Sequence, residues 1–105
     1  MDATGIIFAA LDCDADAIEA WNRWYDLEHT PPNLALPGIM LSRRYVAPPE
    51  LHDVRVAAAG GPYADGRSVF LTIYTLCETP TDVFHGMVGL RERLVAADRM
   101  FPDEK

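Results

Sequence analysis

The stretch SVFLTIYTLC, residues 68–77, is the clearest strand in the chain, because β-branched and aromatic side chains fill it. A helix should follow, since Thr79 suits an N-cap, Pro80 the first helical position and Asp82 the first turn. The apolar face of this helix recurs at spacings of three and four residues as far as about Met100: Val83, Met87, Leu90, Leu94 and Ala97. These residues therefore predict a strand followed by an amphipathic helix.

The N-terminal third predicts the same order, a strand and then a helix. Residues 4–11, TGIIFAAL, place apolar side chains on both faces, as in a central strand that is covered on both sides. A helix is expected from about Ala15, with Asp16 and Glu19 spaced three residues apart for a capping box. The pair Pro31-Pro32 should end this helix, because the residue before a proline is pushed out of helical geometry.

Residues 39–46, IMLSRRYV, alternate like a strand that ends at Pro48-Pro49. Residues 50–67 read as a long loop, in which only residues 54–58 resemble a short edge strand. The resulting order lacks one strand of the α+β ferredoxin-like fold, β-α-β-β-α-β. We therefore expect one domain over residues 1–105. Either residues 54–58 or a partner chain should supply the missing strand, because the first strand would otherwise keep an open apolar edge.

The charge of the chain excludes several classes of partner. Its 105 residues carry 16 acidic and 9 basic side chains, a formal net charge of −7. Such a chain repels phosphate backbones and anionic lipid, so we expect neither nucleic acid nor a membrane as partner. No apolar run approaches the ~20 residues of a membrane span. The N-terminus lacks the basic region of a secretory signal, which predicts a cytoplasmic protein.

Candidate chemistry gathers on the first predicted helix. Trp21, Tyr25 and His29 follow Ile18 at spacings of three, four and four residues, which puts them on one buried face. Asp26 lies three residues before His29, within reach of its ring, and a carboxylate that holds one imidazole nitrogen raises the basicity of the other. The alternative is structural: a histidine near a helix C-terminus suits the helix dipole and hydrogen-bonds a carbonyl. The spacing leaves both interpretations open.

The same region resembles a known family. WYDLEH at residues 24–29 is followed by LALPG at 34–38 and SRRY at 42–45, and LTIYTL stands at 71–76. These residues resemble the W-Y-D-x-E-H, L-A-x-P-G-F and A-R-R-Y motifs and the third strand of EthD-like proteins in the dimeric α/β-barrel superfamily. The match is good over residues 21–46, weaker over 68–84 and absent over 47–67.

The resemblance implies a homodimer whose two sheets face each other, with helices outside and a pocket between helices and sheet in each subunit. Members of the superfamily include cofactor-free monooxygenases, dehydratases, decarboxylases and cyclases of aromatic polyketides, lactone isomerases, haem enzymes and proteins with no known activity. The fold therefore does not fix the reaction. The resemblance does move His29 toward the pocket.

Other polar side chains are candidates for the pocket wall. Tyr74 and Tyr45 could donate a hydrogen bond to a developing oxyanion, although tyrosines more commonly serve a core or an interface. Arg43 and Arg44 point to opposite faces of one strand, so at most one of them enters a given pocket. That arginine would bind a carboxylate or phenolate, and the alternative is an ion pair at the surface or the dimer interface.

We expect a small cofactor-independent enzyme, of lyase, dehydratase, cyclase or monooxygenase type, that acts on an apolar aromatic or polyketide-like molecule. In this hypothesis His29 is the general acid or base and Asp26 orients it. Tyr74, Tyr25 and one arginine position a polar group of the substrate, and Trp21 is either a wall of the pocket or ordinary packing. The main alternative is a non-catalytic small-ligand-binding or oligomeric accessory protein.

A haem-binding protein is the third hypothesis. His85 follows the third strand on the second helix, roughly where haem-degrading relatives keep an axial histidine. The tryptophan and asparagine that accompany the axial histidine in those relatives have no counterpart at the matching strand positions of this chain. His29, His52 and His85 also lack the paired spacing of a zinc site. We therefore expect neither a metal nor another cofactor.

Overall fold

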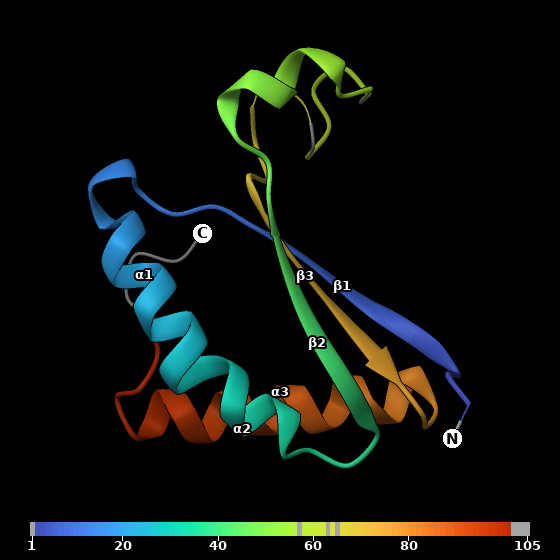
Figure 1. Ribbon diagram of the computed structural model, residues 1–105. Coiled ribbons are helices and arrows are strands. Elements are labelled where there is room, and N and C mark those ends of the chain that lie inside the picture. The colour runs from blue at the N-terminus through green and yellow to red at the C-terminus, as the bar shows by residue number, and fades with distance from the viewer. Residues whose placement is uncertain (1, 57, 63, 65, 102–105) are drawn as a thin grey trace.

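The computed structural model describes residues 2–56, 58–62, 64 and 66–101. In this part of the chain a three-stranded antiparallel sheet carries helices on one side (Figure 1). The strands follow the order β1-β3-β2: β1 (Gly5–Leu11), β3 (Phe70–Leu76) and β2 (Ile39–Val46). The predicted α+β class is confirmed, and the topology is compatible with a small ferredoxin-like fold.

The central strand β3 sets the two faces of the sheet. Its side chains at alternate positions from Phe70 to Leu76 are buried, and those between them are half-buried. Tyr74 pairs with Ile7 of β1 and Ser42 of β2, so these residues share the face that the helices cover. A bulge between Ile39 and Leu41 shifts the predicted alternation at the start of β2. Within this sheet β1 is an edge strand, whereas the sequence predicted a central one.

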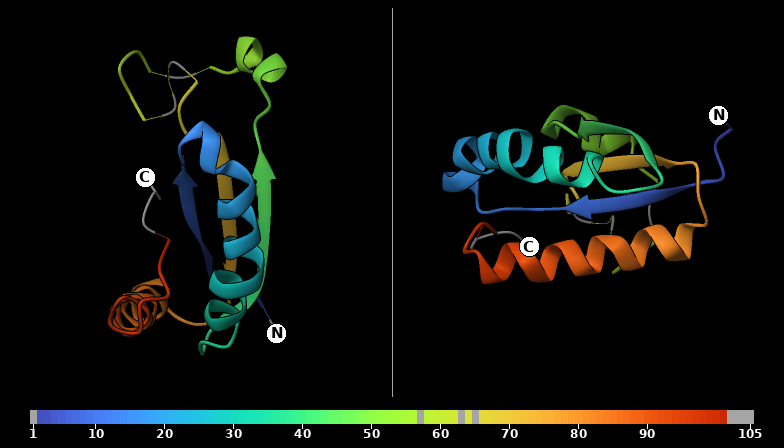
Figure 2. Two further views of the ribbon diagram at one scale, coloured as in Figure 1. Left: turned by 90° about the vertical axis from the view of Figure 1, so that its left-hand side faces the viewer. Right: turned by 90° about the horizontal axis from the view of Figure 1, so that it is seen from below.

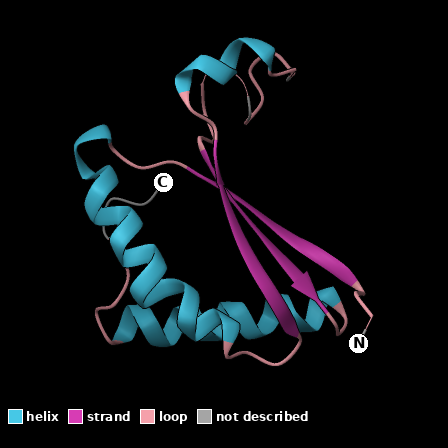
Figure 3. Cartoon of the chain, in the orientation of Figure 1, coloured by secondary structure: helices cyan, strands magenta, loops and turns pink. Residues whose placement is uncertain are grey.

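The first helical region is longer than predicted (Figure 3), and its winding changes three times. It consists of a 3-10 turn, an α-helix, a π-helical turn and a further α-helix: η1 (Ala15–Ala17), α1 (Ile18–Trp24), η2 (Tyr25–His29) and α2 (Thr30–Leu34). The predicted capping box at Asp16 and Glu19 is wrong, because neither η1 nor α1 has a side-chain cap. The N-cap positions are Asp14 and Ala17 instead.

The prediction that Pro31-Pro32 ends this helix is also wrong, because both prolines lie in the first turn of α2. In the preceding π-turn, the Thr30 N–H donates to the Tyr25 carbonyl five residues earlier. This wider winding displaces the carbonyls that would meet the proline rings in a regular α-helix. The chain therefore stays helical as far as Leu34.

The second long helix, α3 (Pro80–Ala96), begins as predicted, with Thr79 at the N-cap and Pro80 at the first position. It lies across one end of the sheet, and its far end approaches α1 (Figures 1 and 2). The Trp24 indole N–H donates to the Arg99 carbonyl at 2.8 Å and ties this far end to α1. No helix in the described ranges is long and apolar enough to cross a membrane.

The buried residues form two clusters at the two ends of the helix-covered face. The first contains Trp21, Trp24, Tyr25 and Phe70, and joins α1 and η2 to the start of β3. The second contains Tyr74, Leu76 and Val83, and joins the end of β3 to the start of α3. Helix α3 begins at the second cluster, and Met100 and Phe101, which follow it, pack against the first. The space under the middle of α3 is therefore available for a cavity.

Residues 54–58 do not supply a fourth strand, and that prediction is corrected. Pro49–Val54 forms the 3-10 helix η3, and Val56 is 99% exposed and in no strand. Ala57 lies outside the described residues. Prolines at positions 48 and 49 lack the N–H groups that a strand needs at its start. In the described part of the chain β1 therefore pairs only with β3.

Candidate functional site

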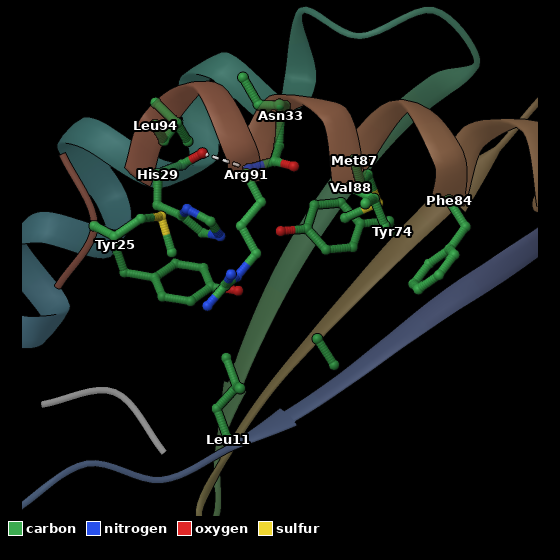
Figure 4. A pocket seen from close by; sticks show the side chains of 13 residues that line it. Leu11, Tyr25, His29, Asn33, Tyr74, Phe84, Met87, Val88, Arg91 and Leu94 are labelled. Atoms are coloured by element: carbon green, nitrogen blue, oxygen red, sulfur yellow. Dashed lines mark hydrogen bonds between the residues drawn. The ribbon is translucent and has the colours of Figure 1, made fainter. Parts of the chain in front are cut away.

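A cavity of about 250 Å³ lies under the middle of α3 (Figure 4). Strands β1 and β3 form its floor, η2 and α2 form one wall, and α3 forms the other. Its lining is mostly apolar: Ala9, Leu11, Tyr25, His29, Asn33, Tyr74, Phe84, Met87, Val88, Leu90, Arg91, Leu94 and Met100. Three residues predicted as functional, His29, Tyr25 and Tyr74, thus meet at one site.

The π-turn η2 brings Tyr25 and His29 to the cavity together. Their ring centroids are 5.0 Å apart and nearly perpendicular, and Tyr25 is fully buried. The Thr72 hydroxyl on β3 donates to the Tyr25 hydroxyl at 2.8 Å, which fixes the phenol against the sheet. Single π-turns within α-helices occur frequently at functional sites, because they re-aim side chains.

His29 is held in a form suited to accept a proton. Its ring stacks on Trp24 with centroids 4.7 Å apart, and its Nδ1 atom is enclosed with no hydrogen-bond partner in the described structure. Burial lowers the pKa of His29 from 6.5 to about 4, and the positive charges of Arg44 and Arg91 act in the same direction. The imidazole is therefore neutral near pH 7.

Asp26 does not orient His29, so this part of the catalytic prediction is wrong. Its carboxylate is 60% exposed and accepts a hydrogen bond from Arg44 at 2.7 Å. Arg44 also donates to Asn22 at 2.7 Å, and its guanidinium lies 4.2 Å from the centroid of the Tyr25 ring. The guanidinium is thus fixed over the face of the Tyr25 ring, and in this position it forms an ion pair with the Asp26 carboxylate.

Four predicted ligand-binding residues lie outside the cavity lining. Arg44 faces the helices, as one of the two arginines must, but it serves the contact between α1 and β2. Arg43 and Tyr45 point to the opposite face of the sheet, because side chains alternate along β2. Trp21 is fully buried against Phe70, with ring centroids 4.6 Å apart, and is a core residue.

Two polar lining residues were missed, and both follow a predicted residue by one helical turn. Asn33 comes four residues after His29, is buried, and donates to the His29 carbonyl at 2.8 Å. Arg91 comes four residues after Met87 on the apolar side of α3. The four-residue spacing was the available signal. It was not used because the helix around Asn33 was expected to end earlier and Arg91 interrupts an apolar pattern.

Comparison of the chain with protein-family models, curated proteins and solved structures gives no match. The EthD-like resemblance consequently depends on the motif residues alone and stays a prediction. Among the residues with described positions, no three His, Cys, Asp or Glu side chains are grouped to hold a metal ion. His85 is exposed on α3 and does not line the cavity.

Proposed function

We propose that this protein is a small enzyme that transfers a proton to or from an apolar, aromatic or polyketide-like molecule bound in the cavity under α3. The observation that carries the proposal is His29, a neutral imidazole with an unsatisfied Nδ1 atom at the wall of an otherwise apolar cavity. A buried polar atom without a partner costs about 1–3 kcal/mol. A ligand that hydrogen-bonds this ring would recover that cost.

The lining supports a general-base reaction of the lyase, dehydratase or cyclase type. Neutral His29 accepts a proton from a carbon acid or hydroxyl group of the substrate, and the electron pair moves onto a conjugated carbonyl oxygen. Tyr25 and Tyr74 line the cavity and are the hydroxyl donors for that oxyanion. The protonated imidazole then returns the proton to a leaving hydroxyl group or to the product carbon.

Deuterium exchange of a model carbon acid tests this proposal without knowledge of the natural substrate. The methylene protons of 1-phenyl-1,3-butanedione in D₂O should exchange faster with the protein than without it, and the effect should saturate with the diketone. Ala9→Leu fills the cavity from β1 and should abolish the acceleration. Proton NMR measures both rates. Saturable binding without acceleration would instead support the alternative, a non-catalytic ligand-binding protein.

We also propose that two copies of the chain pair through the sheet face opposite the helices, in the cytoplasm that the sequence predicts. The helices cover one face only (Figure 2), and large apolar side chains are exposed on the other. These side chains come from all parts of β1 and β2: Ile6, Phe8, Leu41 and Tyr45. Arg43 lies on the same face between Leu41 and Tyr45. Exposed apolar side chains gathered on one face are typical of an interface, and a second copy would cover them with the same side chains.

Ile6→Glu should make the protein monomeric, because a carboxylate would be buried within the interface. The wild-type protein should have a mass in solution of twice that of one chain, which is 11.6 kDa. Val95→Glu is the matched control, since Val95 on α3 is 52% exposed and Ile6 is 55% exposed. Sedimentation equilibrium gives the masses. A monomeric wild-type protein at micromolar concentration contradicts the proposed dimer.

A further inference from the structure

Arg91 stands out in the cavity because its positive charge has no acidic partner among the described residues. The chain has 16 acidic residues, yet no hydrogen bond or ion pair joins Arg91 to any described residue. The other arginine near His29 differs in this respect, since Arg44 is bonded to Asp26. The charge that a ligand meets in this cavity is therefore the guanidinium of Arg91.

The cavity is polar at one end and apolar at the other (Figure 4). Arg91 extends from α3 toward Tyr25, on the side where His29 lies, and the Tyr74 hydroxyl points to the same side. The apolar end is formed by Phe84, Val88 and other side chains without a polar group. An amphiphilic ligand would enter this cavity in one orientation, with its polar group beside Arg91.

The residues at the polar end fit an anion better than a neutral group. A guanidinium forms charge-assisted and often bidentate hydrogen bonds with a carboxylate, and these are roughly twice as strong as neutral ones. His29 is neutral and adds no repulsion toward either charge sign. A cation would be repelled by Arg91. Arg91 is itself exposed, so solvent screens part of this attraction, and its strength comes from the charge-assisted hydrogen bonds.

We infer that the cavity selects an organic anion, an apolar aromatic body that carries a carboxylate or an equally acidic oxygen, and that Arg91 is the residue that selects it. This inference rests on the proposed function in its choice of cavity and deepens it by naming the substrate class. In this arrangement the anionic group pairs with Arg91 and the aromatic body extends along α3. The atom of the ligand that exchanges a proton with the protein then lies near His29.

A bound anion would also change His29. The charged groups that face the imidazole are Arg44 from β2, already paired with Asp26, and Arg91 from α3; Tyr25 and Tyr74 are the titratable neighbours. An anion on Arg91 cancels one of the two charges that lower the pKa of His29. The pKa should therefore rise above about 4 when an anion binds, which makes the ring a stronger base, while burial, the largest cause of the shift, keeps it below 6.5.

Two ligands of the same shape test the inference: 2-naphthoate, which is an anion, and 2-naphthamide, which is neutral. Calorimetric titration should show that Arg91→Gln weakens naphthoate binding about 10- to 100-fold and changes naphthamide binding by less than about threefold. Arg93→Gln removes the same charge from the same helix outside the cavity lining and should change neither affinity. NMR titration of His29 should show the higher pKa with naphthoate only.

The outcomes separate the two proposals. Equal affinities of wild-type protein for both ligands, each abolished by Ala9→Leu, would overturn anion selection and leave the cavity as the binding site. Naphthoate binding that survives Arg91→Gln unchanged, or that falls equally in Arg93→Gln, would also overturn it. If neither ligand binds the wild-type protein, the inference is rejected together with the cavity on which it depends.

Discussion

Replacement of His29 by glutamine is expected to slow the protein-catalysed deuterium exchange by about 10²–10⁴-fold, the usual contribution of a general base. Glutamine keeps a polar side chain of similar length at the wall of the cavity, but it does not accept a proton near neutral pH. The variant should therefore bind 1-phenyl-1,3-butanedione with little change in affinity. A loss of rate without a loss of binding separates a chemical role from a structural one.

His85→Gln is the matched control for this experiment, because His85 is an exposed histidine on α3 outside the cavity lining. It should exchange the diketone at the wild-type rate. The rate of the wild-type protein should fall as the pH drops through about 4, where His29 becomes protonated. Equal rates for His29→Gln and the wild type would contradict the assignment of His29 as the base.

Replacement of Trp21 by alanine is expected to lower the free energy of unfolding by about 3–5 kcal/mol, as for other buried tryptophans. Trp21 is fully buried, and it contacts Tyr25, Phe70 and the guanidinium of Arg44. Its removal opens a void between α1 and the sheet. Because small domains are stable by only about 5–15 kcal/mol, this loss leaves a marginal fold.

Equilibrium urea unfolding followed by circular dichroism measures this loss, at one protein concentration so that self-association does not enter the comparison. Leu27→Ala is the control within the same helical region, because Leu27 is 64% exposed. It should change the free energy of unfolding by less than about 0.5 kcal/mol. If the two variants are equally stable, Trp21 is not a core residue.

The sequence was a reliable guide where one local pattern decides the structure. Alternation predicted the bounds of β2, Ile39–Val46, and the Thr79-Pro80 pair predicted the start of α3. The four-residue spacing of Tyr25 and His29 put both side chains at one cavity wall. In these cases neighbouring residues carry the whole signal, so no tertiary contact is needed to interpret it.

The errors arose where a distant residue competes for a local group. Asp26 was expected to hold His29 three residues away, but Arg44 on β2 is a stronger partner because it is charged and fixed over Tyr25. The π-turn was missed for a different reason, since no local preference distinguishes it from an α-turn. The sequence alone could not decide whether Trp21 lines the cavity or belongs to the core, because that depends on how Trp21 packs against Phe70 of β3.

The π-turn η2 also links the geometry of the site to the number of residues between Tyr25 and His29. A π-turn holds one residue more than the α-turn it replaces, and each residue of an α-helix turns the chain by about 100°. Loss of one residue between Tyr25 and His29 would restore regular winding and leave the imidazole facing the cavity, because the α-turn covers the same rotation with one residue fewer. Chains with and without this extra residue would therefore share the same fold, and both could turn a histidine toward the cavity.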